Sequence, residues 1–188
     1  MVIPPSQVLS LFSGIGGLDK SVKLVFPKSR TVCYVEWGAY AASVLVARMA
    51  DKTLDEAPIW DDITTFNGKP WSGAVDTIIG GFPCVDLSVA GKGEGIKEGN
   101  RSGLFFEYVR IIREIQPRWI FIENVSGLLA NGAMSTVLGE LSKMGFDAEW
   151  GMFSAKDVGA SHQRKRVFVL AHSISKRSSG RSEGLEQR

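Results

Sequence analysis

The stretch VLSLFSGIGGLD, residues 8–19, decides the fold. It begins as a short apolar run of the kind that is buried in a sheet, and it passes through a glycine-rich turn into the start of a helix. Glycines allow the backbone to approach a ligand closely, and the free amides at the start of a helix attract polar or anionic groups. The stretch therefore predicts a parallel α/β unit with a ligand site at its turn.

The alternation of strands and helices continues along the chain. Apolar, β-branched or aromatic runs predict strands at 31–37, 75–81, 119–125 and 166–171, with one more near 146–154. Helix-forming patterns fall at 39–50, 102–116 and 133–144. Because helical crossovers join parallel strands, this order predicts an α/β, Rossmann-like fold with a mostly parallel sheet and helices on both faces.

The helix expected at 102–116 has the clearest two-sided pattern. Ser102 is a suitable N-cap, because its hydroxyl can accept from a free amide of the first turn. Five large apolar side chains recur on one face at helical spacing, namely Phe105, Tyr108, Val109, Ile112 and Ile115. That face is predicted to be the buried one.

Length and composition are those of one globular domain. The chain has 188 residues, 44% of them hydrophobic, and a formal net charge of +2, which permits nucleic-acid binding without indicating it. No apolar run approaches the roughly 20 residues of a membrane span, and the N-terminus lacks the features of a secretory signal. We therefore expect a cytoplasmic protein, in which Cys33 and Cys84 form no metal or disulfide pattern and are thiols.

Two stretches interrupt the pattern. Residues 91–101, GKGEGIKEGNR, hold four glycines with mixed charges and predict a mobile loop. Residues 173–188 are polar and predict a tail or the start of a linker. The folded domain is therefore expected at 1–172.

Acidic residues follow the glycine-rich turn at the ends of the next strands. Asp19 stands where a dinucleotide-binding turn needs its third glycine, so a nucleoside without pyrophosphate fits better. Glu36 is placed to accept from both ribose hydroxyls, and Trp37 beside it offers a flat face for an adenine ring. Asp62, which precedes Ile63, is placed to accept from an exocyclic amine.

Each of these residues also has a plain structural interpretation. The glycines fit a tight turn, Glu36 and Asp62 fit surface carboxylates, and Trp37 fits a half-buried packing residue. Open α/β sheets, however, bind ligands at the carboxyl ends of their strands, where these residues occur in order. Their order favours adenosine recognition.

A second set of reactive side chains follows later strands. Cys84 comes directly after a proline at a strand end, whereas Cys33 lies inside a strand and is expected to be buried. Glu123 ends the apolar run WIFI, where a carboxylate is costly to desolvate without a partner and desolvation raises its pKa. Arg164 and Arg166 alternate onto one face of the last strand. A buried thiol and a solvated basic edge are the structural alternatives.

In combination, these motifs resemble those of the DNA cytosine-5 methyltransferase family. FSGIGG at 12–17 is similar to the family's first motif, GFPCVDLS at 81–88 to its nucleophile motif, ENV at 123–125 to its sixth and QRKRVF at 163–168 to its eighth. The resemblance covers roughly residues 8–171, and the Pro-Cys and ENV pair at strand ends is its most specific part. It implies the methyltransferase form of the Rossmann-like fold.

The resemblance implies catalytic roles for four residues. Cys84 would add to carbon 6 of cytosine and so make carbon 5 nucleophilic. Glu123 would donate to ring nitrogen 3 and stabilise the charge that develops there. Arg164 and Arg166 would position that carboxyl group and the flipped nucleotide, and would lower the pKa of the thiol. The loop at 91–101 is similar to the family segment that closes over a base extruded from double-stranded DNA.

On the cofactor side, the resemblance implies S-adenosylmethionine and no metal. Residues of this chain would contact the ribose, the adenine ring and the edge of the adenine. Apolar side chains would complete the wall of the cofactor pocket. The residues implied are Phe12, Gly14, Gly16, Glu36, Trp37, Asp62, Ile63, Pro83 and Leu104.

The chain also departs from the family pattern. Members normally continue past the eighth motif into a target-recognition region and a last helix motif that completes the cofactor pocket, whereas here only 173–188 follow. We therefore expect a monomeric catalytic domain that acts on DNA, with a possible partner lobe for target recognition. The alternatives are a catalytically silent nucleoside- or DNA-binding fragment and a nicotinamide-dependent dehydrogenase, which Asp19 disfavours.

Overall fold

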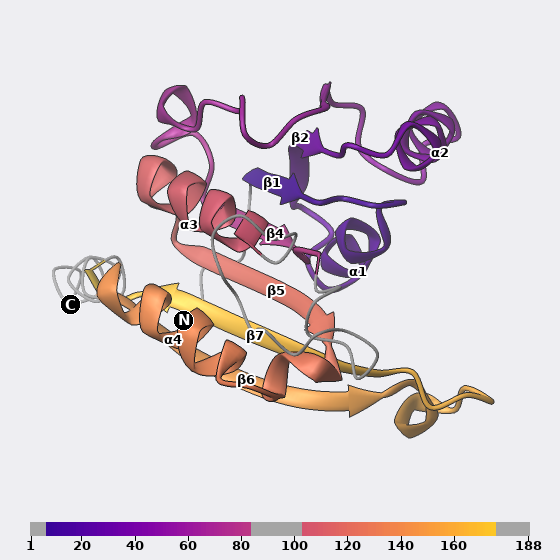
Figure 1. Cartoon of the computed structure of the whole chain (residues 1–188). Coiled ribbons are helices and arrows are strands. Elements are labelled where there is room, and N and C mark those ends of the chain that lie inside the picture. Colours follow the sequence, from indigo (N-terminus) through magenta and orange to yellow (C-terminus); the bar gives the residue numbers. More distant parts are fainter. Residues whose placement is uncertain (1–6, 84–102, 176–188) are drawn as a thin grey trace, which may run out of the picture.

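The computed structural model describes residues 7–83 and 103–175 (Figure 1). The strands are β1 (Gln7–Leu11), β2 (Arg30–Val35), β3 (Ile59–Trp60), β4 (Thr77–Gly80), β5 (Trp119–Val125), β6 (Phe146–Ser154) and β7 (Lys165–Ser173). The helices are α1 (Gly17–Val25), α2 (Ala39–Ala50), α3 (Leu104–Ile115) and α4 (Ala133–Lys143), with short 3-10 turns η1 (Lys69–Trp71), η4 (Ser126–Leu129) and η5 (Ala155–Val158). Within these residues, no helix is long and apolar enough to cross a membrane.

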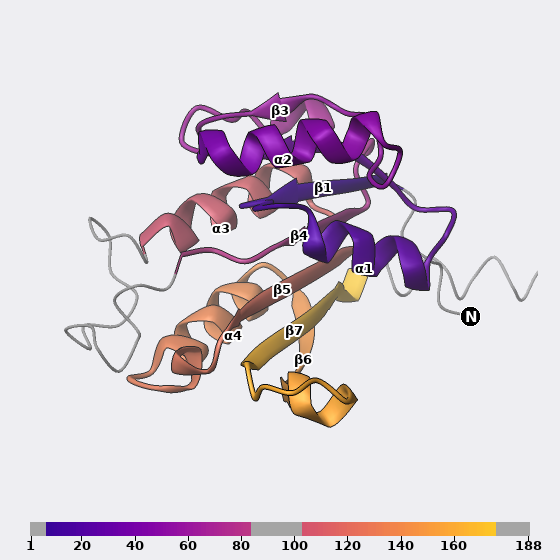
Figure 2. The same cartoon turned by 90° about the vertical axis from the view of Figure 1, so that its right-hand side faces the viewer.

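The strands form one sheet in the order β3-β2-β1-β4-β5-β7-β6. β1 to β5 pair in parallel, whereas β7 runs antiparallel to both of its neighbours, β5 and β6. The helices cover both faces, with α1 and α2 on one side and α3 and α4 on the other (Figures 1 and 2). The predicted α/β fold with a mostly parallel sheet is therefore confirmed.

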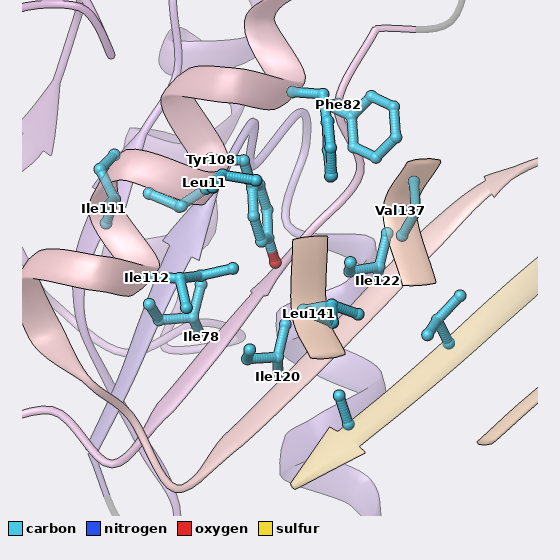
Figure 3. Close-up of a cluster of buried hydrophobic side chains, with 14 of the residues drawn as sticks. Leu11, Ile78, Phe82, Tyr108, Ile111, Ile112, Ile120, Ile122, Val137 and Leu141 are labelled. Carbon is cyan, nitrogen blue, oxygen red and sulfur yellow. The ribbon is translucent and has the colours of Figure 1, made fainter. Parts of the chain in front are cut away.

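The α3 face of the sheet holds the main core. The five side chains predicted to share the buried face of α3 are each at most 1% exposed. Figure 3 shows Tyr108 and Ile112 of α3 above Ile78 and Ile120 of the sheet, with Leu141 of α4 alongside. Full burial of such a side chain contributes about 1.5–3 kcal/mol, so this layer makes a large contribution to the stability of the fold. The helix begins at Leu104 after Gly103; the cap predicted at Ser102 lies outside the described residues.

On the face of the sheet opposite α3, a buried carboxylate links α1 to β1 and β2. Asp19 is 4% exposed and accepts hydrogen bonds from Ser10 Oγ of β1 (2.9 Å) and Thr31 Oγ1 of β2 (3.0 Å). Burial raises the pKa of Asp19 to about 6, and the two hydroxyl bonds only partly oppose that rise. The residue that departs from the dinucleotide pattern therefore joins the first turn of α1 to two strands.

Replacing Asp19 by Asn should change how stability depends on pH. The pKa of Asp19 is higher in the folded protein than the ordinary value of 3.8, so folding favours the protonated form. The contribution of protonated Asp19 to the free energy of unfolding is fully present below about pH 4 and is lost as pH rises through about 6. The change amounts to about 3 kcal/mol. Asn has the shape of the protonated acid but does not titrate.

Urea unfolding of both proteins across this range measures the effect. Asp19→Asn should gain stability relative to the wild-type chain as pH rises from about 4 to about 7. Parallel stability curves for the two proteins would show that Asp19 does not titrate as described.

Candidate functional site

A cavity of about 730 Å³ lies at the carboxyl ends of the parallel strands. Ends of parallel strands meet at one edge of a sheet, so residues far apart in sequence come together there. Seven of the nine predicted cofactor contacts line this cavity, and the exceptions are Gly14 and Gly16. The seven are Phe12, Glu36, Trp37, Asp62, Ile63, Pro83 and Leu104.

The two exceptions lie in the glycine-rich turn and have positive φ, +55° at Gly14 and +79° at Gly16. Gly14 lines a second, neighbouring cavity, and a Cβ there would have no atom within 4 Å. Gly16 lines neither cavity. A Cβ at Gly16 would collide with the side chain of Leu54, so this glycine permits close packing of the turn.

The carboxylate of Glu36 holds the turn in place. One oxygen accepts from the amide of Gly14 and the other from the amide of Gly38, each at 2.7 Å. These charge-assisted bonds join the turn after β1 to the end of β2. Each carboxylate oxygen keeps a lone pair that can accept from a ligand hydroxyl.

Trp37 stands open at the cavity. Its side chain is 79% exposed although it lines the cavity, so the interpretation of Trp37 as a half-buried packing residue is wrong. A flat apolar face that is left open by the described part of the chain is suited to stacking on an aromatic ligand ring.

The second cavity, of about 570 Å³, adjoins the first. Phe12 and Gly81 line both, so the two spaces meet at these residues. Three of the four predicted catalytic residues line the second cavity, namely Glu123, Arg164 and Arg166. The fourth, Cys84, lies outside the described residues, as does the loop predicted at 91–101.

Glu123 and Arg166 form an ion pair in this cavity. Arg166 Nε lies 2.7 Å from Glu123 Oε1, and the two side chains are 23% and 31% exposed. The register of the antiparallel pair explains the contact: Glu123 lies opposite Phe168, two residues from Arg166 and therefore on the same face. Arg166 thus provides the charged partner that offsets the desolvation of the Glu123 carboxylate on an apolar strand.

The segment that leads to Cys84 is held against β5. A Cβ at Gly81 would lie 2.5 Å from the carbonyl oxygen of Glu123, so only glycine permits this approach. Asn124 Nδ2 donates to the carbonyl of Phe82 (3.1 Å), and its side chain is buried. No role for Asn124 was predicted from the sequence, although a polar residue inside the apolar β5 was a signal for one.

Two residues of the second cavity have unusual backbone conformations. Phe12 has φ of +51° and Arg164 of +29°, values that non-glycine residues rarely adopt. Such conformations cost about 1–3 kcal/mol and cluster at functional sites, so their presence here supports a functional cavity.

Cys33 lines neither cavity, in contrast to most of the predicted site residues. It lies in β2 and is 2% exposed, and burial raises the pKa of its thiol to about 11. The prediction that Cys33 is a buried apolar residue agrees with this position.

Comparison with known proteins decides the family. A sequence model of C-5 cytosine-specific DNA methylases matches residues 6–187. The chain belongs to this family. The resemblance found in the motifs is therefore confirmed.

Two curated relatives of this methylase-family chain are bacterial and viral enzymes. Type II methyltransferase M.NgoPII of Neisseria gonorrhoeae is 34% identical over 172 residues, which are 88% of this chain and 48% of the relative. Type II methyltransferase M.CviJI of Paramecium bursaria Chlorella virus IL3A is 33% identical over 165 residues, 88% of this chain and 42% of the relative. The chain thus spans less than half the length of these relatives.

Solved structures show the same fold. Spodoptera frugiperda DNMT2 is 23% identical with a TM-score of 0.71, over 89% of this chain and 50% of that one. Entamoeba histolytica methyltransferase EhMeth is 19% identical with a TM-score of 0.73, over 89% of this chain and 52% of that one. The methylase-family chain therefore has the methyltransferase form of the α/β fold.

Replacing Glu36 by Gln should destabilise this methylase domain. Gln preserves the shape, but its amide nitrogen would face one of the two backbone amides that the carboxylate accepts from. Loss of a hydrogen bond to a charged group costs about 1.5–3 kcal/mol. Urea unfolding measures this loss. Glu149→Gln, on the exposed part of β6, is the matched control and should change the free energy of unfolding little. Equal stability of the Glu36 and Glu149 variants would contradict the stabilising role of the two hydrogen bonds to Glu36.

Proposed function

We propose that the chain transfers a methyl group from S-adenosylmethionine to carbon 5 of a cytosine in DNA, through a covalent bond to Cys84. The observation that carries the proposal is the Glu123–Arg166 pair, which lies against Gly81, where the nucleophile motif begins. Family membership supports the reaction class. Adjoining cavities on the two sides of Gly81 suit a cofactor and a base.

The lining of the first cavity fits S-adenosylmethionine. Three carboxylates, Glu36, Asp61 and Asp62, accompany its apolar walls, and no Lys, Arg or His is among the described residues of the lining. Carboxylates accept from hydroxyls and amines and attract a cation, whereas phosphate groups would need positive partners. When bound, the cofactor supplies an electrophilic methyl group on a sulfonium.

Individual residues of the first cavity have separate tasks in the proposal. Glu36 accepts from the ribose hydroxyls, and Trp37 stacks on adenine. Asp62 and Ile63 meet the edge of the adenine. Apolar contact comes from Phe12, Pro83 and Leu104, while Gly14 and Gly16 shape the turn beside them.

In the second cavity, the thiolate of Cys84 attacks carbon 6 of the base. A sulfur–carbon bond forms, and electron density moves to carbon 5 and ring nitrogen 3. Glu123 holds a proton at nitrogen 3, and Arg166 fixes the direction of its carboxyl group. Carbon 5 then takes the methyl group and loses its proton, and Cys84 leaves as thiolate, which gives 5-methylcytosine, S-adenosylhomocysteine and a proton.

Positive charge would activate the nucleophile without a neighbouring base. Arg164 and Arg166 both line the cavity beside the segment that leads to Cys84. Nearby guanidinium groups favour a thiolate and so lower the pKa of the thiol. The base must first leave the duplex, because its carbon 6 is inaccessible in the stack.

A second candidate function is favoured by an uncovered surface. Phe153 is 59% exposed and Leu170 46% exposed. Phe153 lies opposite Arg166 and Leu170 opposite Phe121, so both are on the face of the sheet that carries Glu123. No described α-helix lies in front of β5 and β7 on that face (Figure 2). The relatives are about twice as long as the aligned region. On this account, the chain is a cofactor-binding lobe that acts only with a second lobe that recognises the DNA target.

A fluorinated oligonucleotide tests the catalytic proposal. With S-adenosylmethionine and single-stranded DNA that contains 5-fluorocytosine, the chain should form a covalent adduct that survives denaturing electrophoresis, because fluorine blocks the final elimination. A single strand is chosen because it removes the cost of base flipping. Cys84→Ser should abolish the adduct, whereas the matched variant Cys33→Ala should retain it.

Two outcomes separate the candidates. An adduct that forms only when the chain is extended by a recognition region supports the second candidate. An adduct that persists in Cys84→Ser, or that is absent from the extended chain as well, rules out covalent catalysis by Cys84.

A further inference from the structure

The turn after β3 holds one carboxylate of the cofactor cavity in a defined orientation. Thr64 donates twice to the same oxygen of Asp62, Oδ1, from its backbone amide at 2.9 Å and from its hydroxyl at 2.8 Å. Oδ2 of Asp62 has no hydrogen-bond partner within residues 7–83 and 103–175. Asp62 and Thr64 both line the first cavity, so one oxygen is committed to the turn while the other is available to a ligand.

The backbone of this turn is fixed by other groups. Trp60 Nε1 donates to the carbonyl of Asp62 and to the hydroxyl of Thr65, both at 3.0 Å. The amide and the hydroxyl of Thr65 donate to the same carbonyl, at 3.1 and 2.9 Å. Three of these bonds go to the carbonyl of Asp62, and none involves its carboxylate.

A guanidinium from α3 holds the turn from its other side. Arg110 Nη2 donates to the carbonyl of Ile63 at 2.8 Å, and Nη1 donates to the carbonyl of Phe66 at 2.9 Å. Arg110 is itself fixed by ion pairs with Glu107 (2.7 Å) and Glu114 (3.1 Å). Loss of the Thr64 hydroxyl would therefore remove one of the two hydrogen bonds that hold Oδ1 of Asp62 and leave the turn in place.

We propose that Thr64 is a positioning residue that sets the specificity of the cavity for a 6-aminopurine. The inference rests on the proposed function, in which the cavity takes an adenosine-containing cofactor. An ionised carboxylate only accepts hydrogen bonds, so the free oxygen of Asp62 suits an exocyclic amine and opposes the carbonyl oxygen of a 6-oxopurine. Thr64 contributes by holding that oxygen in one direction, which lowers the entropy lost on binding.

A role confined to the fold predicts a different pattern. If Thr64 only capped the turn, its loss would weaken every nucleoside ligand by the same factor. If it orients Asp62, its loss weakens the 6-amino ligand more than the 6-oxo ligand. The ratio of the two dissociation constants therefore separates the two roles.

Calorimetric titration with S-adenosylhomocysteine and with its deaminated form, S-inosylhomocysteine, measures this ratio. The wild-type chain should prefer the 6-amino ligand. Thr64→Val should reduce that preference about five- to tenfold, the effect expected for a charge-assisted bond at a partly exposed site. Thr64→Ser restores the hydroxyl and should restore the preference. The matched control is Thr65→Val, which removes a neighbouring hydroxyl that bonds to the main chain and should leave the ratio unchanged.

The outcomes distinguish this inference from the proposed function. Wild-type binding with equal losses for both ligands in Thr64→Val, or with the same change in Thr65→Val, overturns the role of Thr64 alone. Failure of the wild-type chain to bind either ligand overturns the cofactor assignment, and the inference with it.

Discussion

The parallel direction of β1 to β5 is the constraint on which the site depends. Since these strands end at one edge, Phe12, Glu36 and Pro83 reach one cavity although they come from separate parts of the chain. The antiparallel β7 then adds a contribution that a parallel strand could not, because its first residues enter at that same edge. Arg166 is thereby placed beside Glu123, and the second cavity forms next to the first.

The acidic groups of the site are already engaged with their own backbone. Glu36 accepts from two amides of neighbouring turns, and Asp62 accepts from Thr64. Carboxylates held in this way lose little freedom on binding, which is the physical advantage of a preformed site. The same bonds shape the glycine-rich turn and the turn after β3, so the fold and the site are stabilised by the same contacts.

The order of strands and helices, the buried face of α3 and the grouping of most predicted contacts were readable from the sequence, because they follow from hydrophobic period and strand direction. The tasks of Asp19, Thr64 and Asn124 were not. Asp19 was interpreted only as a missing glycine, and its hydroxyl partners depend on the register of β1 against β2. Asn124 bonds to a carbonyl 42 residues away, a pairing that no local pattern contains. Gly16 matched a motif, yet it serves packing against Leu54.

The central claim is that the two adjoining cavities hold a nucleoside cofactor and a base, with the reacting atoms meeting between Phe12 and Gly81. A crystal structure of the chain with S-adenosylhomocysteine tests this most directly. The account predicts ribose hydroxyls on Glu36, adenine on Trp37 and the ligand sulfur at the junction of the two cavities. A ligand bound elsewhere, or one whose sulfur points away from Glu123 and Arg166, would contradict it.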